Sequence, residues 1–172
     1  TYLNVAGPEA AARAVVDCWS SLWTARAIGY RSRNGISHLD VSLCVVVQIM
    51  VPAESSGVLF TANPLNGRRS EVVVDATLGL GEALVGGLVE PDHYEIDAKE
   101  KGGGIYRIVR KTLGSKAVQI KGIEGGGVST DKEAQCGDVQ AISDEIILEL
   151  ARTGKDIEEY YGFPQDVEFS VS

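Results

Sequence analysis

The sequence has few of the residues that form disulfides or zinc sites. Its three cysteines, Cys18, Cys44 and Cys136, lie far apart without a CxxC pair. The two histidines share no metal-ligand spacing with them. This pattern argues against a disulfide framework and against a zinc site. We therefore expect free thiols in a reducing compartment, and a cytoplasmic location.

Positive charge and long apolar runs are also scarce. The net charge of −8 and the pI near 4.8 argue against nonspecific nucleic-acid binding, which needs a basic face. No apolar run approaches the roughly 20 residues that span a membrane. The first residues, TYLNVAG, contain neither an initiator Met nor a signal-peptide pattern. Together with the abrupt end, this start predicts a fragment of a longer protein.

The composition that is present predicts a packed core. Hydrophobic residues make up 44% of the chain and charged residues 23%. The 20 glycines fall in short clusters, which indicates tight turns rather than a flexible linker. We therefore expect residues 1–172 to form a single, partial domain.

Two segments have apolar residues at helical spacing. In the first, 8–31, we expect Trp19 and Trp23 to anchor the core. The arginines beside this stripe are expected to be solvated, with a phosphate contact as the alternative: Arg26, Arg31 and Arg33. The second helix is predicted to start at the N-cap Ser143 and to end at the C-cap Gly162.

The remaining segments have the pattern of β-strands and turns. The run SLCVVVQIMV, 42–51, is β-branched and uncharged, which predicts a fully buried central strand. A hairpin is expected over 56–76, around Asn63-Pro64 and Asn66-Gly67. The other expected elements are a loop and short helix at 77–87, strands at 92–97, 105–111 and 116–121, a turn at Gly102–Gly104, a loop at 122–140 and a last strand at 164–172. This order predicts an α+β fold, a mainly antiparallel sheet with flanking helices on one face.

The last strand, PQDVEFSVS, alternates acidic and apolar residues. Residues two apart share one face of a strand, so Asp166 and Glu168 point away from Val167 and Phe169. Two carboxylates about 7 Å apart could hold a hard cation and bring a phosphate to it. On pattern alone, a solvated outer face of an edge strand is the simpler interpretation.

Two further segments have residues suited to a nucleotide. Gln48, Met50 and Val51 lie where a strand would end before Pro52, and a strand-to-loop hinge can pair with the edge of adenine. A plain core strand is the simpler interpretation. The GLGE stretch lets the backbone approach a phosphate or ribose, and Glu82 could accept ribose hydroxyls. It lacks the GxGxxG and Walker A patterns, so a structural turn remains the alternative.

Four strings together carry a family resemblance: SLWTARAIGYR, VVVQIMVPAESSGVLFTANP, GLGEALVGGLVEPDHYEID and IEEYYGFPQDVEF. They resemble the nucleotide-binding region of phosphoenolpyruvate synthases, pyruvate phosphate dikinases and rifampicin phosphotransferases, and are nearest to the synthase and rifampicin branches. The resemblance covers nearly the whole chain and is loosest over 98–142.

This resemblance implies the second subdomain of an ATP-grasp fold, with ATP and Mg²⁺ as ligands. It implies that Gln48 to Val51 form the adenine hinge and that Thr61 lies near the phosphates. Glu82 would lie at the ribose side. Glu168 would bind magnesium with support from Asp166.

The resemblance also implies partners within a longer polypeptide: a cationic N-terminal subdomain, a phosphohistidine domain and an acceptor-binding domain. The intact protein would phosphorylate a histidine with ATP and pass the phosphoryl group to pyruvate or, alternatively, to a rifamycin. A noncatalytic nucleotide-binding module is the rival from another class. Without the cationic half, we expect this chain alone to be inactive, to bind Mg-ATP weakly and to self-associate through uncovered apolar surface.

Overall fold

The computed structural model of the protein describes residues 1–98, 105–132, 134 and 136–172. The fold divides into two compact units. The first contains Thr1–Met50 and Gly122–Val128, and the second contains Val51–Lys121 and Ser129–Ser172. The boundary after Met50 falls inside the candidate adenine hinge.

The helical part of the first unit is broken in its middle. Helix α1 spans Pro8–Ser20, a 3-10 turn spans Ser21–Trp23, and α2 spans Ala25–Arg33. The hydroxyl of Thr24 caps α2 by accepting a hydrogen bond from the backbone N–H of Ala27, at 3.3 Å. A hydroxyl that competes for backbone partners favours a helix start over a helix interior. The prediction of one helix over 8–31 is therefore wrong at this turn.

The side chains of this helix pair also differ from expectation. Trp19 and Trp23 are each about half exposed, so they do not anchor a core. Arg31, expected to be solvated, is buried. Its guanidinium donates to Nδ1 of His38 at 3.0 Å and to the carbonyl of Leu22 at 2.6 Å, and it lies 5.5 Å from the Trp23 ring centre. Arg31 thus fastens the corner between the 3-10 turn and α2.

The prediction of a buried central strand at 42–51 is wrong. This segment belongs to no helix or strand, and Val46, Val47 and Ile49 are strongly exposed. A strand requires a neighbour for its backbone N–H and C=O groups. None of the residues that the structure describes pairs with this segment.

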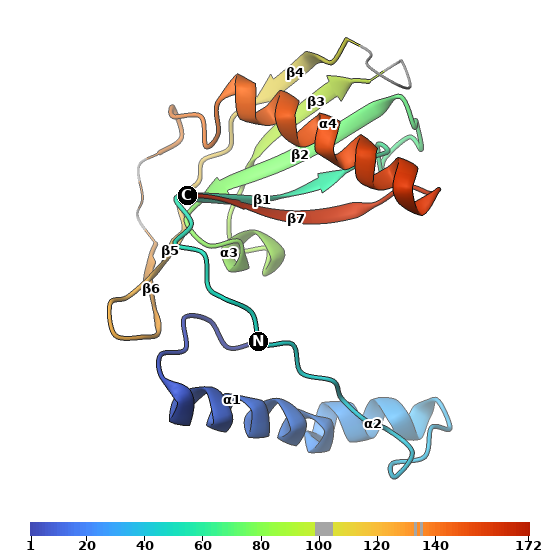
Figure 1. The fold of residues 1–172 in the computed structure, drawn as a ribbon, viewed down its shortest axis with the longest axis vertical. Coiled ribbons are helices and arrows are strands. Elements are labelled where there is room, and N and C mark those ends of the chain that lie inside the picture. Colours follow the sequence, from blue (N-terminus) through green and yellow to red (C-terminus); the bar gives the residue numbers. More distant parts are fainter. Residues whose placement is uncertain (99–104, 133, 135) are drawn as a thin grey trace. The chain divides into compact units, whose positions relative to one another are not determined.

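The second unit is built on a five-stranded antiparallel sheet in the order β4-β3-β2-β1-β7 (Figure 1). The strands are β1 Ser55–Phe60, β2 Glu71–Leu78, β3 Asp92–Asp97, β4 Arg107–Thr112 and β7 Asp166–Val171. The predicted hairpin is confirmed as the β1–β2 pair. The sheet and its helices confirm the α+β class. The C-terminal strand β7 follows β1 at the end of this order, so it lies at an edge of the sheet.

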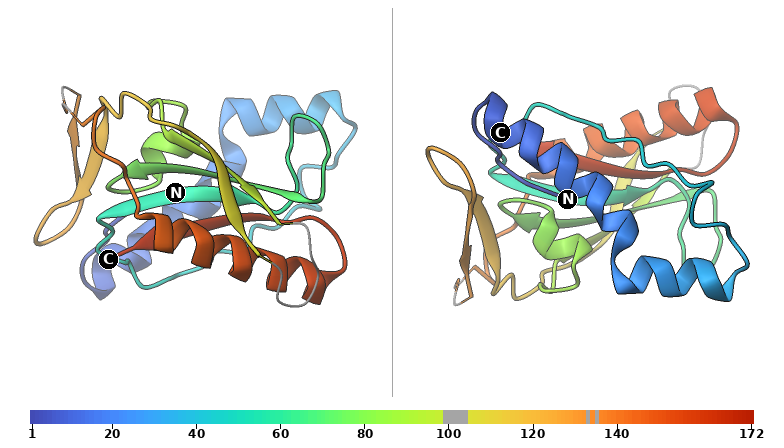
Figure 2. Two further views of the ribbon diagram at one scale, coloured as in Figure 1. Left: turned by 90° about the horizontal axis from the view of Figure 1, so that it is seen from above. Right: turned by 90° about the horizontal axis from the view of Figure 1, so that it is seen from below.

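Helix α4, Asp144–Tyr161, covers one face of the sheet, as Figures 1 and 2 show. Both predicted caps are confirmed: Ser143 accepts from the N–H of Ile146 at 3.4 Å, and Gly162 has φ +81°. Gly154 allows close packing, since a Cβ there would lie 2.5 Å from Cδ2 of Leu59. The core between α4 and the sheet contains Leu59, Val72, Val74, Ala76, Tyr94, Ile96, Ile147 and Ala151.

The helices are not confined to one face, contrary to the prediction. The short helix α3, Glu82–Val85, follows β2 and lies on the side of the sheet away from α4 (Figures 1 and 2). It confirms the predicted loop and short helix.

A second, two-stranded sheet pairs β5, Gln119–Gly122, with β6, Val128–Asp131. The expected strand at 116–121 is confirmed in its second half. The expectation of a loop over 122–140 is wrong at residues 128–131, which form β6. The run Gly125–Gly127 is the hairpin turn before this short strand. The predicted turn Gly102–Gly104 lies outside the described residues. No described helix is both long enough and apolar enough to cross a membrane.

Candidate functional site

The acidic side chains of β7 lie on the sheet face opposite α4. Asp166 and Glu168 are exposed, whereas Val167 and Phe169 are half-buried and pack against the core. The predicted alternation along this strand is therefore confirmed. The two carboxylates share one face, and they do so because strand geometry sends every second side chain to the same side.

The strand register aligns these acids with residues of β2 and β3. Val58 on β1 pairs with Glu168 on β7 and with Asp75 on β2, and Asp75 pairs in turn with His93 on β3. One residue row thus crosses four strands. We call the polar residues that share this face the carboxylate face: Asp75, His93, Glu95, Asp166 and Glu168.

The carboxylate face contains a series of polar contacts across β2, β3 and β4. Nδ1 of His93 lies 2.6 Å from Oδ1 of Asp75, and its Nε2 lies 3.6 Å from Oε1 of Glu95. Arg110 of β4 adds one more contact, because its Nη1 lies 3.5 Å from the same Glu95 oxygen. The side chains of His93, Asp75 and Glu95 are each between a fifth and a third exposed. The imidazole thus lies between two carboxylates and is within hydrogen-bond distance of Asp75.

The donors of β7 fit magnesium in type but do not form a complete cage. Carboxylate oxygens are the hard ligands that Mg²⁺ prefers, and the ion keeps several positions for water and phosphate. Within the described residues, no group of three or more His, Cys, Asp or Glu side chains could hold a metal ion by itself. Asp166 and Glu168 therefore suit an ion that arrives with a phosphorylated ligand.

Thr61 occupies a different environment from the one expected of a phosphate contact. It is fully buried where β1 ends, and its hydroxyl accepts from the N–H of Gln165 at 2.8 Å. Its N–H donates to the Gln165 carbonyl at 3.0 Å, and its own carbonyl accepts from Nζ of Lys155 at 2.7 Å. Thr61 fastens the start of β7 to the end of β1. A phosphate contact by Thr61 stays a prediction, and it would require the hydroxyl to be uncovered.

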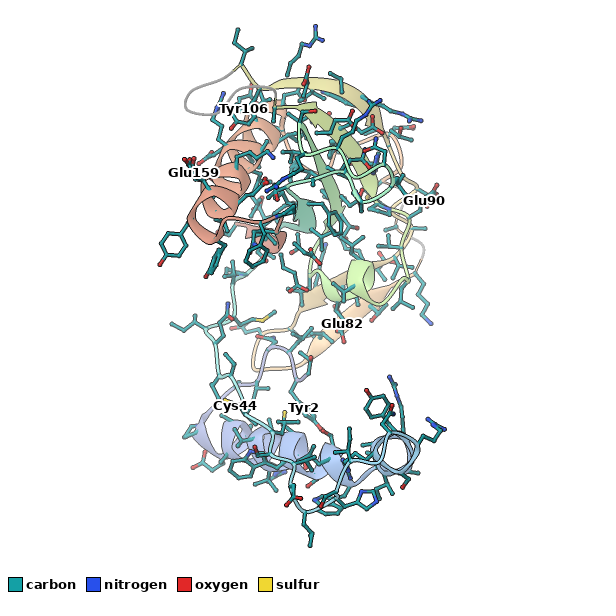
Figure 3. The ribbon with its side chains drawn as sticks, turned by 90° about the vertical axis from the view of Figure 1, so that its right-hand side faces the viewer. Tyr2, Cys44, Glu82, Glu90, Tyr106 and Glu159 are labelled. Carbon is teal, nitrogen blue, oxygen red and sulfur yellow. The ribbon has the colours of Figure 1, made fainter. Side chains whose placement is uncertain are left out.

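Glu82 lies in the first turn of α3 and is exposed; Figure 3 shows it projecting from that helix. The preceding glycine turn reaches the carboxylate side of the sheet, since a Cβ on Gly81 would lie 3.5 Å from the Cβ of Ser56. Beside Ser56, the hydroxyl of Thr77 is fully buried and has no hydrogen-bond partner among the described residues. Glu82 and the glycine turn therefore border the same face as β7.

The remaining candidates lie around the unit boundary. Gln48 and Met50 belong to the first unit, and Val51 opens the second. Gln48 is exposed and Met50 is half-buried in a segment without secondary structure. The predicted role of these residues at adenine stays a prediction.

Asp75 and His93 were not among the residues predicted from the sequence. Their contact depends on the register of β2 against β3, which links positions 18 residues apart. A weak signal was present, because Asp75 interrupts the apolar run VVVDA and His93 alternates with the buried Asp92 and Tyr94.

Comparison with known proteins gives consistent matches over the full length of the chain. Residues 1–172 match the family model described as pyruvate phosphate dikinase, AMP/ATP-binding domain. Curated relatives include a rifampicin phosphotransferase of Bacillus cereus, 45% identical over 99% of this chain, and a probable phosphoenolpyruvate synthase of Pyrococcus abyssi, 44% identical over 99%. The phosphoenolpyruvate synthase of Pyrococcus furiosus is 42% identical over 99%. The chain spans about a fifth of the length of these relatives: 19%, 21% and 21% of each.

Proposed function

The chain belongs to the pyruvate phosphate dikinase AMP/ATP-binding domain family, and from that premise we propose that it is the magnesium-binding half of an ATP-grasp site. The observation that carries the proposal is the pair of exposed carboxylates that β7 presents on the face away from α4. Glu168 is the proposed magnesium ligand, and Asp166 supports it. Bound magnesium would neutralise charge on the phosphates during transfer.

The other candidate residues have proposed roles around the same nucleotide. Gln48, Met50 and Val51 would pair with the adenine edge, and Glu82 would accept hydrogen bonds from the ribose. Support for Glu82 comes from the glycine turn before it, which borders the carboxylate side of the sheet. The role of Thr61 would be to hold β7 in register with β1, through its buried hydroxyl, with a direct phosphate contact as the alternative.

The intact polypeptide would transfer a phosphoryl group from ATP to a histidine in a separate domain, and from there to an acceptor. Relatives named as phosphoenolpyruvate synthases and as rifampicin phosphotransferases match this chain at similar identity. Pyruvate is the acceptor that we propose, with a rifamycin as the alternative. We place the enzyme in the cytoplasm. The 172-residue chain by itself would be inactive, because phosphoryl transfer also needs the cationic groups of the other half.

Labelling of the full-length polypeptide with ATP that carries ³²P at both its β and γ phosphates tests this proposal. We expect an acid-labile, base-stable label, the behaviour of phosphohistidine, and at least a hundredfold slower labelling in Glu168→Gln; losing a charge-stabilising group typically costs about 10²–10³ in rate. Asp156→Asn, an exposed acid of α4, is the matched control and should label normally. Normal labelling by Glu168→Gln would contradict the proposed role of Glu168. A wild-type protein that takes up no label would favour a noncatalytic module.

A further inference from the structure

We propose that Asp75, held in position by His93, is a third carboxylate of the metal–nucleotide site. This inference rests on the proposed function, and it assigns a part to residues on β2 and β3 that the motifs of β7 do not include. Asp75 would contact the metal or its bound water, and His93 would be a positioning residue.

The sheet register carries the first step. Val58 pairs with Glu168 on one side and with Asp75 on the other, so the three residues lie in one row across β7, β1 and β2. Neighbouring strands are about 4.8 Å apart, which places the Cα atoms of Glu168 and Asp75 about 10 Å from each other. Mg–O bonds are about 2 Å long, so this span leaves room for a hydrated ion or a metal-bound phosphate between the two carboxyl groups.

Side-chain direction carries the second step. Val74 and Ala76 are fully buried beneath α4, so Asp75 between them points to the opposite face. The same alternation sends Glu168 to that face, since Phe169 packs into the core. Val58, half-buried between the two acids, forms an apolar floor without a charge that could neutralise either one.

The two carboxyl oxygens of Asp75 differ in their hydrogen bonding. One carboxyl oxygen, Oδ1, lies 2.6 Å from Nδ1 of His93, and the other oxygen has no hydrogen-bond partner among the described residues. The other ring nitrogen, Nε2, lies 3.6 Å from Oε1 of Glu95, and that oxygen also contacts Arg110. A carboxylate fixed through one oxygen, with the second oxygen available, has the arrangement that outer-shell partners give to metal ligands.

A buried hydroxyl close to Asp75 has no hydrogen-bond partner among the described residues. Thr77 follows Asp75 by two residues on the same face of β2, and its Oγ1 is fully buried without a hydrogen bond to any described residue. Buried hydroxyls in native proteins nearly always have a partner, from the protein, a ligand or ordered water. In the adjoining row, Ser56 pairs with both Thr77 and Ser170, and its Oγ lies 3.3 Å from that of Ser170. Three hydroxyls from β1, β2 and β7 thus lie in the row beside that of Asp75 and Glu168, with Ser56 and Thr77 buried and Ser170 exposed.

Mn²⁺ in place of Mg²⁺ gives a readout that does not depend on catalysis. In ¹H–¹⁵N spectra of the 172-residue chain with ATP, bound Mn²⁺ should broaden the amide signals of Val58, Asp75 and Glu168. The dissociation constant for Mn²⁺–ATP follows from the titration. We expect Asp75→Asn to weaken it about tenfold or more, and His93→Ala to weaken it about tenfold, the usual effect of losing a supporting residue. His93→Gln can still donate to Asp75 and should recover most of the affinity.

The outcomes separate this inference from the proposed function. Asp156→Asn is the matched control and should bind like the wild type. If the wild type shows no localised broadening, the proposed function fails and this inference with it. If Glu168→Gln abolishes the broadening but Asp75→Asn and His93→Ala bind like the wild type, only this inference is overturned. Should Asp75→Asn lose its dispersed spectrum, His93→Ala decides, because it keeps the charge of Asp75 but releases its carboxylate.

Discussion

Asp92, the first residue of β3, lies at the centre of a buried polar cluster. Its side chain and that of Lys116 are completely buried and form an ion pair. The same carboxylate accepts from the N–H of Gly114 at 2.9 Å, from the N–H of Ala141 at 2.7 Å and from the hydroxyl of Tyr94 at 3.0 Å. Burial, together with this carboxylate, raises the pKa of Tyr94, so the phenol remains a donor. One side chain thus joins three segments behind the carboxylate face.

Breaking this pair should be costly. We expect Asp92→Asn to lower the free energy of unfolding by about 3–5 kcal/mol, because Lys116 would remain buried without its counter-charge. Urea denaturation followed by circular dichroism measures the change. Asp156→Asn, an exposed substitution, should stay within about 0.5 kcal/mol of the wild type. The double variant Asp92→Leu/Lys116→Met should be more stable than Asp92→Asn; equal loss in both would contradict the account.

At the scale of elements, α4 is attached to the β1–β2 turn by a second charged cluster. Glu158 accepts from the guanidinium of Arg69 at 2.8 and 3.1 Å and from Nζ of Lys155 at 2.6 Å. Lys155 also donates to the backbone carbonyls of Thr61 and Arg69. Burial acts to raise the pKa of Glu158, but these hydrogen bonds outweigh it and the pKa is lowered. The cluster keeps the start of β7 fixed beside β1.

This cluster predicts a pH-dependent contribution to stability. A lowered carboxyl pKa stabilises the fold above the unfolded value of about 4.3 and loses its effect as the pH falls through the folded value. We expect Glu158→Gln to cost about 1–3 kcal/mol at pH 7 and progressively less below about pH 4. Chemical denaturation at a series of pH values measures it. Glu159→Gln, its exposed neighbour in Figure 3, is the control; a pH-independent difference for Glu158→Gln would refute the assignment.

The elements that could be predicted from the sequence are those with local causes. The caps of α4 depend on Ser143 and Gly162 themselves, and the two faces of β7 follow from alternation over six residues. Segment 42–51 has equally strong β composition but no partner strand in the described chain, and composition cannot reveal a missing neighbour. The contact of His93 with Asp75 depends on register between strands, which no local pattern encodes.

At the scale of the whole molecule, several large apolar side chains are left exposed. Val46, Val47 and Ile49 project from a segment without secondary structure, and Trp19 and Trp23 are about half exposed. Single exposed apolar residues are ordinary, but a run of this kind marks a contact surface. If the proposed function holds, the rest of the nucleotide-binding domain would cover this run.

The isolated chain should therefore associate with itself. We expect sedimentation velocity to show an average mass that rises with concentration. Val47→Lys combined with Ile49→Lys should shift the chain toward monomer, because charged side chains at these exposed positions oppose apolar contact between copies. Val139→Lys, at another exposed apolar position, serves as the control. A monomer at all concentrations in the unmodified chain would contradict this prediction.

The central claim, that β7 supplies the metal side of a nucleotide site, is tested most directly by titrating the ¹⁵N-labelled chain with ATP in the presence and absence of Mg²⁺. We predict weak, saturable shifts of the amide signals at Asp166, Glu168 and their β1 partners, dependent on Mg²⁺ and lost in Glu168→Gln. Shifts that are the same without Mg²⁺, or that persist in Glu168→Gln, would contradict it.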